Sequence, residues 1–309
     1  MAVPSGTLVA TANYHDAWEM VVIQDSQMLT LNTPGAPVFY EMTNWIASNA
    51  ASRDIKMVVH MGDVTSINSG SGLVADHEQQ LTDASGALAV LDDAGIPWMP
   101  NIGNHDYDSA YPYNYTHWTT YFPVSRFSGK AWYGGRNTAS SYNDNLFFLF
   151  SAGGKDYVLV GQSYNQTTAA QFAWAASVFD AYPSRVGLYS THSYLWDDGG
   201  YTGNNTGYGN WTYNITNDVI TVCPNVLLTM NGHDSAGDGQ LNTTQVVGGR
   251  TVWNMLYGHA NNVTLGYLRI LRFVPAEGKI YATTYSPHTD TWLTDAPNQW
   301  SWDVGVGAI

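Results

Sequence analysis

The feature that most constrains the fold is a series of short apolar segments, each ending in a cluster of polar residues. The segments have the length and composition of buried strands. Five such endings occur along the chain: Asp25-Ser26-Gln27, Gly62-Asp63, Gly103-Asn104-His105-Asp106, Thr191-His192-Ser193 and Asn231-Gly232-His233-Asp234. In open α/β sheets, ligands bind at the carboxyl ends of the strands. Catalytic or ligand-binding residues are therefore expected in these polar clusters.

The segments between the first three strands have helical periodicity. Apolar residues recur at helical spacing over residues 38–49, and a second helical segment covers residues 73–91 and stops at Gly95. The strands that these helices connect are predicted at residues 20–24, 55–60 and 96–102. The order strand, helix, strand, helix, strand predicts parallel pairing and an α/β core.

The later part of the chain continues with strands and short helices. Residues 108–144 are rich in Tyr, Pro, Gly, Ser and Asn without clear periodicity, which predicts a long irregular excursion that walls a cleft. No linker composition or repeat interrupts the chain, so residues 1–309 are predicted to form one domain. Strands are predicted at residues 146–150, 157–160, 186–190, 225–230, 245–247, 251–256, 265–274 and 279–285, and helices at residues 171–179 and 215–222.

Composition narrows the class of protein. Hydrophobic residues make up 44% of the 309 residues and charged residues only 12%, which is typical of a packed globular chain. Lys and Arg number 11 against 25 Asp and Glu, a formal charge of −14 that makes a nucleic acid polymer a poor partner. No apolar stretch of about 20 residues occurs, so neither a transmembrane helix nor a membrane partner is expected.

The composition also bears on localisation. The first residues lack the basic segment and the apolar run of a signal peptide. Few Lys and many Asn, Thr, Gly, Tyr and Trp residues favour a secreted or periplasmic protein, with the sequence as its mature chain.

Several enzyme classes lack their motifs in this chain. There is no G-x-S-x-G nucleophile motif and no G-x-x-x-x-G-K-[ST] or G-x-G-x-x-G phosphate loop. The single cysteine, Cys223, excludes an internal disulfide and a zinc site built from cysteines. The strand endings instead carry oxygen and imidazole donors, and such a set can hold two divalent ions with one carboxylate shared. These donors are Asp25, Gln27, Asp63, Asn104, His192 and His233.

The order of the five motifs resembles the calcineurin-like metallophosphoesterase family, over about residues 20–285. The resemblance implies an α/β fold in four layers, a β-sandwich of two mixed sheets flanked by helices, with a dinuclear metal centre at the strand ends. By motif, Asp63 would bridge the two ions and Asp25 would bind the first. The second ion would be bound by Asn104, His192 and His233. Residues 266–269 and 284–287 also resemble the later part of a bacterial secreted subgroup of the family.

Two positions depart from the family pattern. Most members have His where this chain has Gln27, and a second His where it has Ser235. A neutral amide or hydroxyl oxygen binds a divalent ion less strongly than imidazole, so we expect a weaker first site. That site would prefer a harder ion such as Mn²⁺ or Mg²⁺, or would recruit water or Asp234.

The remaining histidines have structural interpretations. His60 precedes the Gly-Asp motif and is a candidate to support the metal ligands from behind. His259 is the rival of His233 for the last imidazole ligand, but it lacks a preceding strand that ends in Asn-Gly. By default the others are surface or structural residues: His15, His77, His117 and His288.

The resemblance implies a phosphoesterase mechanism with Mn, Fe, Zn or Mg as the two ions. The ions would activate a hydroxide for in-line attack on phosphorus in a small phosphorylated substrate, either a monoester or a diester. His105 would face the substrate and protonate the leaving group, with Asp106 orienting it. The substrate cleft would be walled by Tyr107, Tyr111, Tyr113 and Trp118. The residues expected to contact the substrate are Asn104, His105, Tyr107 and Arg136, the last as a phosphate contact.

Two other functions stay open on the sequence alone. A metal-poor family member could bind a phosphate or glycan ligand without turnover, as Gln27, Ser235 and the abundant aromatic residues suggest. The retained His105 and Asp106 argue for an enzyme instead. A hydrolase of a different bond could use the same activated water, because fold and motifs fix the attack chemistry better than the substrate.

Overall fold

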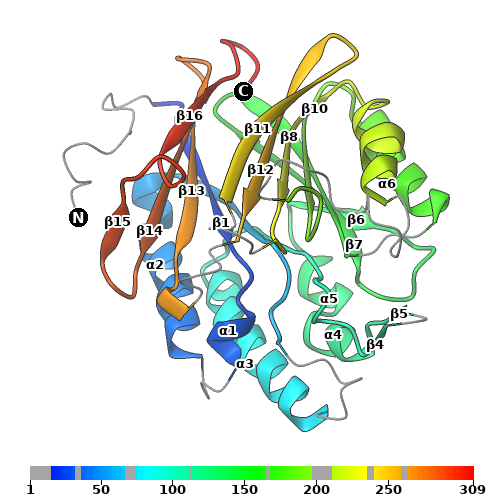
Figure 1. Cartoon of the computed structure of the whole chain (residues 1–309), viewed down its shortest axis with the longest axis vertical. Helices are drawn as coiled ribbons and strands as arrows, with labels where there is room; N and C mark the ends of the chain where they lie inside the picture. The colour runs from blue at the N-terminus through cyan, green and yellow to red at the C-terminus, as the bar shows by residue number, and fades with distance from the viewer. Residues whose placement is uncertain are drawn as a thin grey trace.

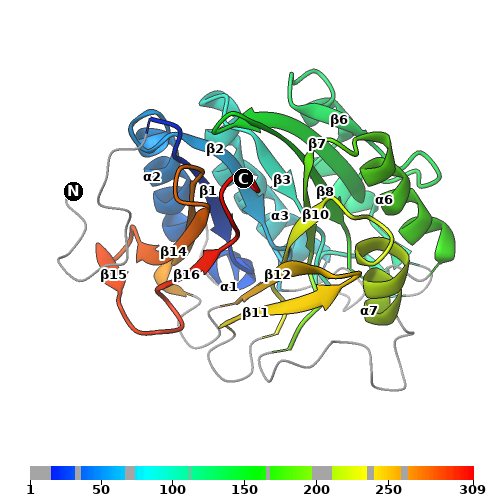
Figure 2. The same cartoon turned by 90° about the horizontal axis from the view of Figure 1, so that it is seen from above.

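The structure is a computed structural model that describes residues 15–31, 36–66, 74–110, 113–164, 168–196, 211–234, 240–258 and 264–309. In this part of the chain, two mixed β-sheets of seven strands each lie against one another, with helices on their outer sides (Figures 1 and 2). This arrangement confirms the predicted α/β class and the sandwich of two mixed sheets.

The first sheet contains the N-terminal strands and the C-terminal strands. Its order is β15 (Thr291–Leu293), β14 (Lys279–Ser286), β13 (Leu268–Val274), β1 (Trp18–Ile23), β2 (Ile55–His60) and β3 (Trp98–Pro100), with β16 (Trp300–Asp303) paired to β14. The middle of the chain forms the second sheet. Its order is β11 (Gln240–Val247), β12 (Arg250–Tyr257), β10 (Val226–Asn231), β9 (Val186–Thr191), β8 (Lys155–Gln162), β7 (Asn145–Ala152) and β6 (Tyr133–Arg136).

The helices and one small hairpin complete the described elements. The hairpin pairs β4 (Ser109–Ala110) with β5 (Tyr113–Asn114). The helices are α1 (Gln27–Thr30), α2 (Pro37–Arg53), α3 (Val74–Asp93), α4 (Thr116–Tyr121), α5 (Val124–Phe127), α6 (Ala169–Ala181), α7 (Trp211–Asn214) and the π-helical segment η2 (Ile215–Ile220).

The pairing register brings the strand ends together. In the first sheet, β1, β2 and β3 are parallel, as predicted, and Ile23 lies beside His60, which lies beside Pro100. In the second sheet, β8, β9 and β10 are also parallel. Because the carboxyl ends of neighbouring parallel strands reach the same edge, the residues that follow them emerge side by side.

Apolar contacts hold the layers together. Trp18 on β1 stacks on Phe273 with ring centroids 4.0 Å apart, and its edge meets Tyr157 of the second sheet at 5.0 Å. Helices α2 and α3 lie on the outer side of the first sheet, and α6 with η2 lies on the outer side of the second (Figure 2). The burial of these apolar faces, rather than helix propensity, supplies most of the stabilisation of such elements.

The excursion over residues 108–144 contains more order than predicted. It includes β4, β5, α4, α5 and β6, each two to six residues long. Elements this short leave no periodicity in the sequence, so tertiary packing fixes them instead. Trp118, Phe122 and Phe127 anchor the segment in the main core with at most 1% of each side chain exposed. Trp118 is therefore a core residue, where a cleft wall was predicted.

Other elements differ from prediction in smaller ways. The short strands β15 and β16 were not predicted, and residues 215–220 are π-helical where an ordinary helix was expected. Within the described ranges, no helix combines the length and the apolar composition needed to cross a membrane.

Candidate metal centre

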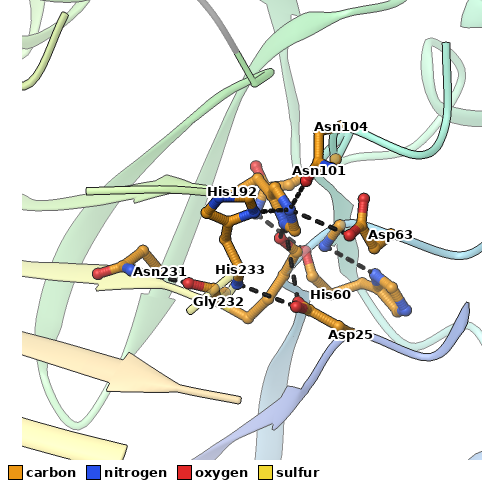
Figure 3. Close-up of polar contacts among 12 residues, drawn as sticks. Asp25, His60, Asp63, Asn101, Asn104, His192, Asn231, Gly232 and His233 are labelled. Atoms are coloured by element: carbon orange, nitrogen blue, oxygen red, sulfur yellow. Dashed lines mark hydrogen bonds and ion pairs between the residues drawn. The ribbon is translucent and has the colours of Figure 1, made fainter. Parts of the chain in front are cut away.

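Five strands of the two sheets present five of the six predicted ligands close together, and the sixth, Gln27, begins α1. Asp25 follows β1, Asp63 follows β2 and Asn104 follows β3, all in the first sheet. His192 follows β9 and His233 follows β10, both in the second sheet. Figure 3 shows these side chains gathered around the ring of His192.

The ring of His192 is the centre of the cluster. Its Nδ1–H donates to the carbonyl oxygen of Met61 at 2.8 Å, which directs Nε2 away from that carbonyl. Nε2 faces the Oδ1 atom of Asn104 at 2.9 Å, the Oδ2 atom of Asp63 at 3.3 Å and the Nδ1 atom of His233 at 3.2 Å (Figure 3). The oxygen and imidazole-nitrogen neighbours are lone-pair donors, so they converge on a point that needs positive charge.

A divalent cation fits this donor set. Ligand atoms of Asp63, His192 and His233 all lie within 4.8 Å of one another. Imidazole and carboxylate groups together suit Zn, Fe and Mn, and the Asn104 amide oxygen adds a further hard donor. The four residues are thus able to hold one ion.

The residues predicted for the other ion carry unsatisfied oxygens. Oδ1 of Asp25 and Oε1 of Gln27 are buried and have no hydrogen-bond partner in the described part of the chain. The second oxygen of Asp25, Oδ2, accepts the backbone N–H of His233 at 2.9 Å. A buried acceptor without a donor is costly, and a cation placed beside each of these oxygens would satisfy it. Gln27 therefore offers the oxygen that a metal site needs, although it is not a histidine.

The pKa values of the clustered side chains also indicate that positive charge is needed among them. Burial lowers the pKa of His192, but the carboxylates of Asp63 and Asp25 outweigh it and raise that pKa to about 9. Burial raises the pKa of Asp25 to about 7, and burial together with the His192 charge lowers the pKa of His233 to about 3. Without metal, a proton on His192 supplies the charge for the lone pairs around it.

Glycines allow the ligands to approach the neighbouring backbone. A Cβ atom on Gly103 would lie 1.9 Å from Oδ1 of Asp63, and one on Gly232 would lie 2.3 Å from Oδ1 of Asp25. Two ligands also hold left-handed backbone, with φ of 51° at Asp63 and 72° at His233. Such conformations are uncommon for residues other than glycine and concentrate at functional sites. Glycine is thus needed at positions 103 and 232 because a side chain there would collide with a ligand.

His60 supports the turn before Asp63, in the position expected from the sequence. Its Nδ1 accepts the N–H of Gly62 at 3.1 Å, so its Nε2–H donates to Oγ of Ser26 at 2.9 Å. Burial lowers the pKa of His60 to about 3, which keeps the ring neutral. The neutral tautomer joins the loop after β1 to the loop after β2.

His105 and Asp106 do not make the contact that the resemblance implies. The Nδ1–H of His105 donates to the carbonyl oxygen of Ser66 at 2.8 Å. Asp106 accepts backbone N–H groups instead, from Gly103 at 2.7 Å and from Thr65 at 3.0 Å. By accepting both N–H groups, the Asp106 carboxylate joins the loop that carries Asn104 and His105 to the loop that follows β2. Asp106 therefore holds the loop, and Ser66 orients the ring.

Other predicted site residues have different surroundings. Tyr107 packs against the main core, and Nη1 of Arg136 donates to the carbonyl oxygens of Asn137, Ser140 and Tyr142 in its own loop. Their contact with a substrate stays a prediction. Residues outside the described ranges are Tyr111, Ser235 and His259, and the side chain of Tyr113 is likewise not described.

Sequence reasoning missed four residues around the centre. The ring of Tyr164 lies 5.7 Å from that of His192, and the ring of Trp196 lies 6.1 Å from that of His233. Ser66 orients His105, and Oε1 of Gln80 on α3 accepts the N–H of Ser66 at 2.7 Å. Tyr164 and Trp196 follow strand ends, and that position was the only signal available.

Comparison with curated proteins found one relative of similar sequence. The chain is 29% identical over 288 residues to the uncharacterized protein YvnB of Bacillus subtilis. The match covers 88% of this chain and 20% of the relative, so the chain spans about one fifth of that protein's length. A comparison with protein-family profiles found no match.

Solved structures with a similar arrangement have low sequence identity. GAP50 of Plasmodium, an anchor in the inner membrane complex, is 10% identical, with 92% of this chain and 89% of that chain covered at a TM-score of 0.47. The sulfate thiohydrolase SoxB of Thermus thermophilus is 10% identical, with 85% and 54% covered at 0.43. A predicted phosphoesterase of Streptococcus pneumoniae is 10% identical, with 93% and 98% covered at 0.37.

Proposed function

We propose that this protein is a metal-dependent phosphoester hydrolase. The observation that carries the proposal is the crowding of donor atoms around Nε2 of His192, where Asp63, Asn104 and His233 converge within 3.3 Å. Such a set is costly to assemble unless a cation occupies it. We propose that residues 1–309 form one domain.

The residues divide into two groups of ligands. Asp63, Asn104, His192 and His233 would hold one ion. Asp25 and Gln27, whose Oδ1 and Oε1 atoms accept no hydrogen bond in the described part of the chain, would hold the other together with the shared Asp63. When bound, a pair of divalent ions supplies an activated water and neutralises the charge on a phosphoryl group. Mn, Fe, Zn and Mg are the candidate ions.

His105 is the candidate general acid. Because the carbonyl of Ser66 holds the proton on Nδ1, the proton that the imidazolium form of the ring would deliver to a leaving alkoxide is the one on Nε2. A positioned acid of this kind contributes about 10² to 10⁴ in rate. Asp106 serves this step indirectly, because its carboxylate holds the backbone of Gly103 and Thr65.

The substrate we propose is a small phosphorylated molecule, either a monoester or a diester. Tyr164 and Trp196 line one side of the centre, and 37% of the Trp196 side chain is exposed, so it is able to meet a bound ligand. Tyr107 and Arg136 remain proposed substrate contacts. With a net charge of −14, we propose that the protein acts without a nucleic acid partner, in a secreted or periplasmic setting.

Metal reconstitution followed by a substrate panel tests the proposal. The full chain would be stripped with EDTA, loaded with Mn²⁺, desalted and measured by inductively coupled plasma mass spectrometry. We expect bound metal, together with hydrolysis of 4-nitrophenyl phosphate or bis(4-nitrophenyl) phosphate that EDTA abolishes. Asp63→Asn should remove both turnover and the Mn²⁺ bound at this centre, whereas Asp218→Asn, a change at an exposed carboxyl group, should remove neither.

Other outcomes would change the assignment. A folded wild-type chain that binds no Mn²⁺, Zn²⁺ or Fe²⁺ would overturn the proposal in favour of a ligand-binding module. Bound metal with no turnover of phosphoesters, but with turnover of sulfate esters or other bonds, would keep the centre and reject phosphorus as the atom attacked. A metal-replete and fully active Asp63→Asn protein would reject the ligand assignment itself.

A further inference from the structure

A second group of potential ligands lies close to the His105 loop but outside the proposed centre. It contains His77 on α3, Asp108 in the loop after β3, and His117 on α4. One ligand atom from each lies within 4.8 Å of the others. Oδ1 of Asp108 lies between the two rings, 2.7 Å from Nδ1 of His117 and 3.7 Å from Nε2 of His77.

The burial of this group is graded. The side chain of His77 is fully buried, that of Asp108 is 8% exposed and that of His117 is 28% exposed. The group is therefore closed on the His77 side and reached from solvent on the His117 side. A carboxylate in such a place needs positive charge beside it.

The Asp108 carboxylate is held in a fixed orientation. Its Oδ2 atom accepts the backbone N–H of His117 at 3.1 Å, and the N–H of Asp108 donates to the carbonyl of Asn114 at 2.7 Å. With Oδ2 engaged in this way, Oδ1 is presented to both imidazole rings. Ordered presentation of one oxygen reduces the entropy cost of binding an ion.

His117 has a carboxylate on each side of its ring. Nε2 of His117 lies 3.3 Å from Oε1 of Glu78, while Nδ1 faces Asp108. Glu78 directly follows His77 on α3, so one helix supplies both an imidazole and this outer carboxylate. A histidine that binds a metal through one nitrogen commonly donates its other N–H to a carboxylate in the same way.

From these contacts we propose that His77, Asp108 and His117 form a mononuclear zinc site, separate from the centre around His192. Two imidazole nitrogens and one carboxylate oxygen form a donor set that Zn²⁺ favours, whereas Ca²⁺ and Mg²⁺ prefer oxygen alone. Bonds of about 2.0 to 2.1 Å in a tetrahedron place ligand atoms about 3.4 Å apart. The separations of 2.7 and 3.7 Å bracket that value, so small side-chain movements would bring the three ligands to one ion and leave its fourth position to water.

The site joins elements that position His105. Asp108 lies three residues after His105 in the same loop, and α3 carries both His77 and, one turn later, Gln80. Gln80 accepts the N–H of Ser66, whose carbonyl orients the His105 ring. A zinc ion at His77, Asp108 and His117 would fix α3 and α4 against this loop. It would act as a structural ion and not as part of the reaction.

Zinc stoichiometry of the full chain tests this assignment. Wild type, His77→Gln/His117→Gln and the matched control His288→Gln would be dialysed against Zn²⁺ and measured by inductively coupled plasma mass spectrometry. His288 is exposed and pairs with Glu41, so it belongs to neither proposed metal site. We expect the double variant to bind one equivalent fewer than wild type, and the control to bind the same amount. An unchanged stoichiometry in the double variant would overturn the site and leave an ion-pair cluster only.

A second measurement needs no change at the site. In Asp63→Asn/His192→Gln the proposed catalytic ligands are impaired, and X-ray absorption at the zinc edge reports the neighbours of the ion that remains. One equivalent coordinated by two imidazoles would support the assignment, even if the His77→Gln/His117→Gln protein does not fold. No bound zinc, or an ion coordinated by oxygen alone, would reject it. If the catalytic proposal alone were wrong, wild type would still bind this one equivalent.

Discussion

The Nδ1–H of His105 donates a hydrogen bond to the carbonyl oxygen of Ser66, and the two atoms lie 2.8 Å apart. The N–H of the same Ser66 residue donates to Oε1 of Gln80 at 2.7 Å. The Gln80 side chain on α3 therefore orients the His105 ring through one intervening residue, Ser66. This relay replaces the contact between Asp106 and His105 that the motif implies, and it leads to two separate predictions.

Loss of the His105 ring should affect substrates according to their leaving groups. His105→Gln is expected to lower kcat by about 10² or more on alkyl phosphates, because an alkoxide needs a proton as it departs. The loss on 4-nitrophenyl phosphate should be much smaller, since nitrophenolate leaves without one. Steady-state kinetics on both substrates, with metal content measured in parallel and His288→Gln as the control, checks this. Equal losses on the two substrates would argue against the general-acid role.

Gln80 should act as a positioning residue. Gln80→Leu removes the oxygen that accepts the N–H of Ser66, so the His105 ring should be less well held and kcat should fall about tenfold. Gln80→Glu keeps an acceptor oxygen and should restore most of the activity. Gln79→Leu, at the exposed neighbouring position on α3, is the matched control. A loss in Gln80→Leu that Gln80→Glu does not restore would point to general damage of the helix.

A single methyl group at Gly103 should disable the centre. The added Cβ would lie 1.9 Å from Oδ1 of Asp63, which is closer than any two such atoms can stay, so the carboxylate must move. Gly103→Ala is therefore expected to lose bound metal and at least 10² in kcat/KM. Gly129→Ala serves as the control, because a Cβ at Gly129 has no heavy atom within 4 Å. Full metal content and activity in Gly103→Ala would contradict this prediction.

The parallel strands and their polar endings were predictable because both depend on local sequence. The run over residues 55–60 is apolar and ends in Gly62-Asp63, and β2 has the predicted bounds. Ser66, Gln80 and Tyr164 were not predictable, since each contributes through tertiary contacts and belongs to no motif. His77, Asp108 and His117 come from three separate elements, so no spacing in the sequence indicates that they meet.

The buried carboxyl group of Asp144 should impose a pH dependence on stability. Burial raises its pKa from 3.8 to about 6, so the folded state holds the proton more tightly than the unfolded state. Its contribution to the free energy of unfolding is full below about pH 4 and is lost as the pH rises through 6. Asp144→Asn cannot ionise, so from pH 4 to pH 8 its stability relative to wild type should improve by about 2 kcal/mol. Urea denaturation of the EDTA-treated proteins across this range measures the change, with exposed Asp303→Asn as the control, and a constant difference would contradict it.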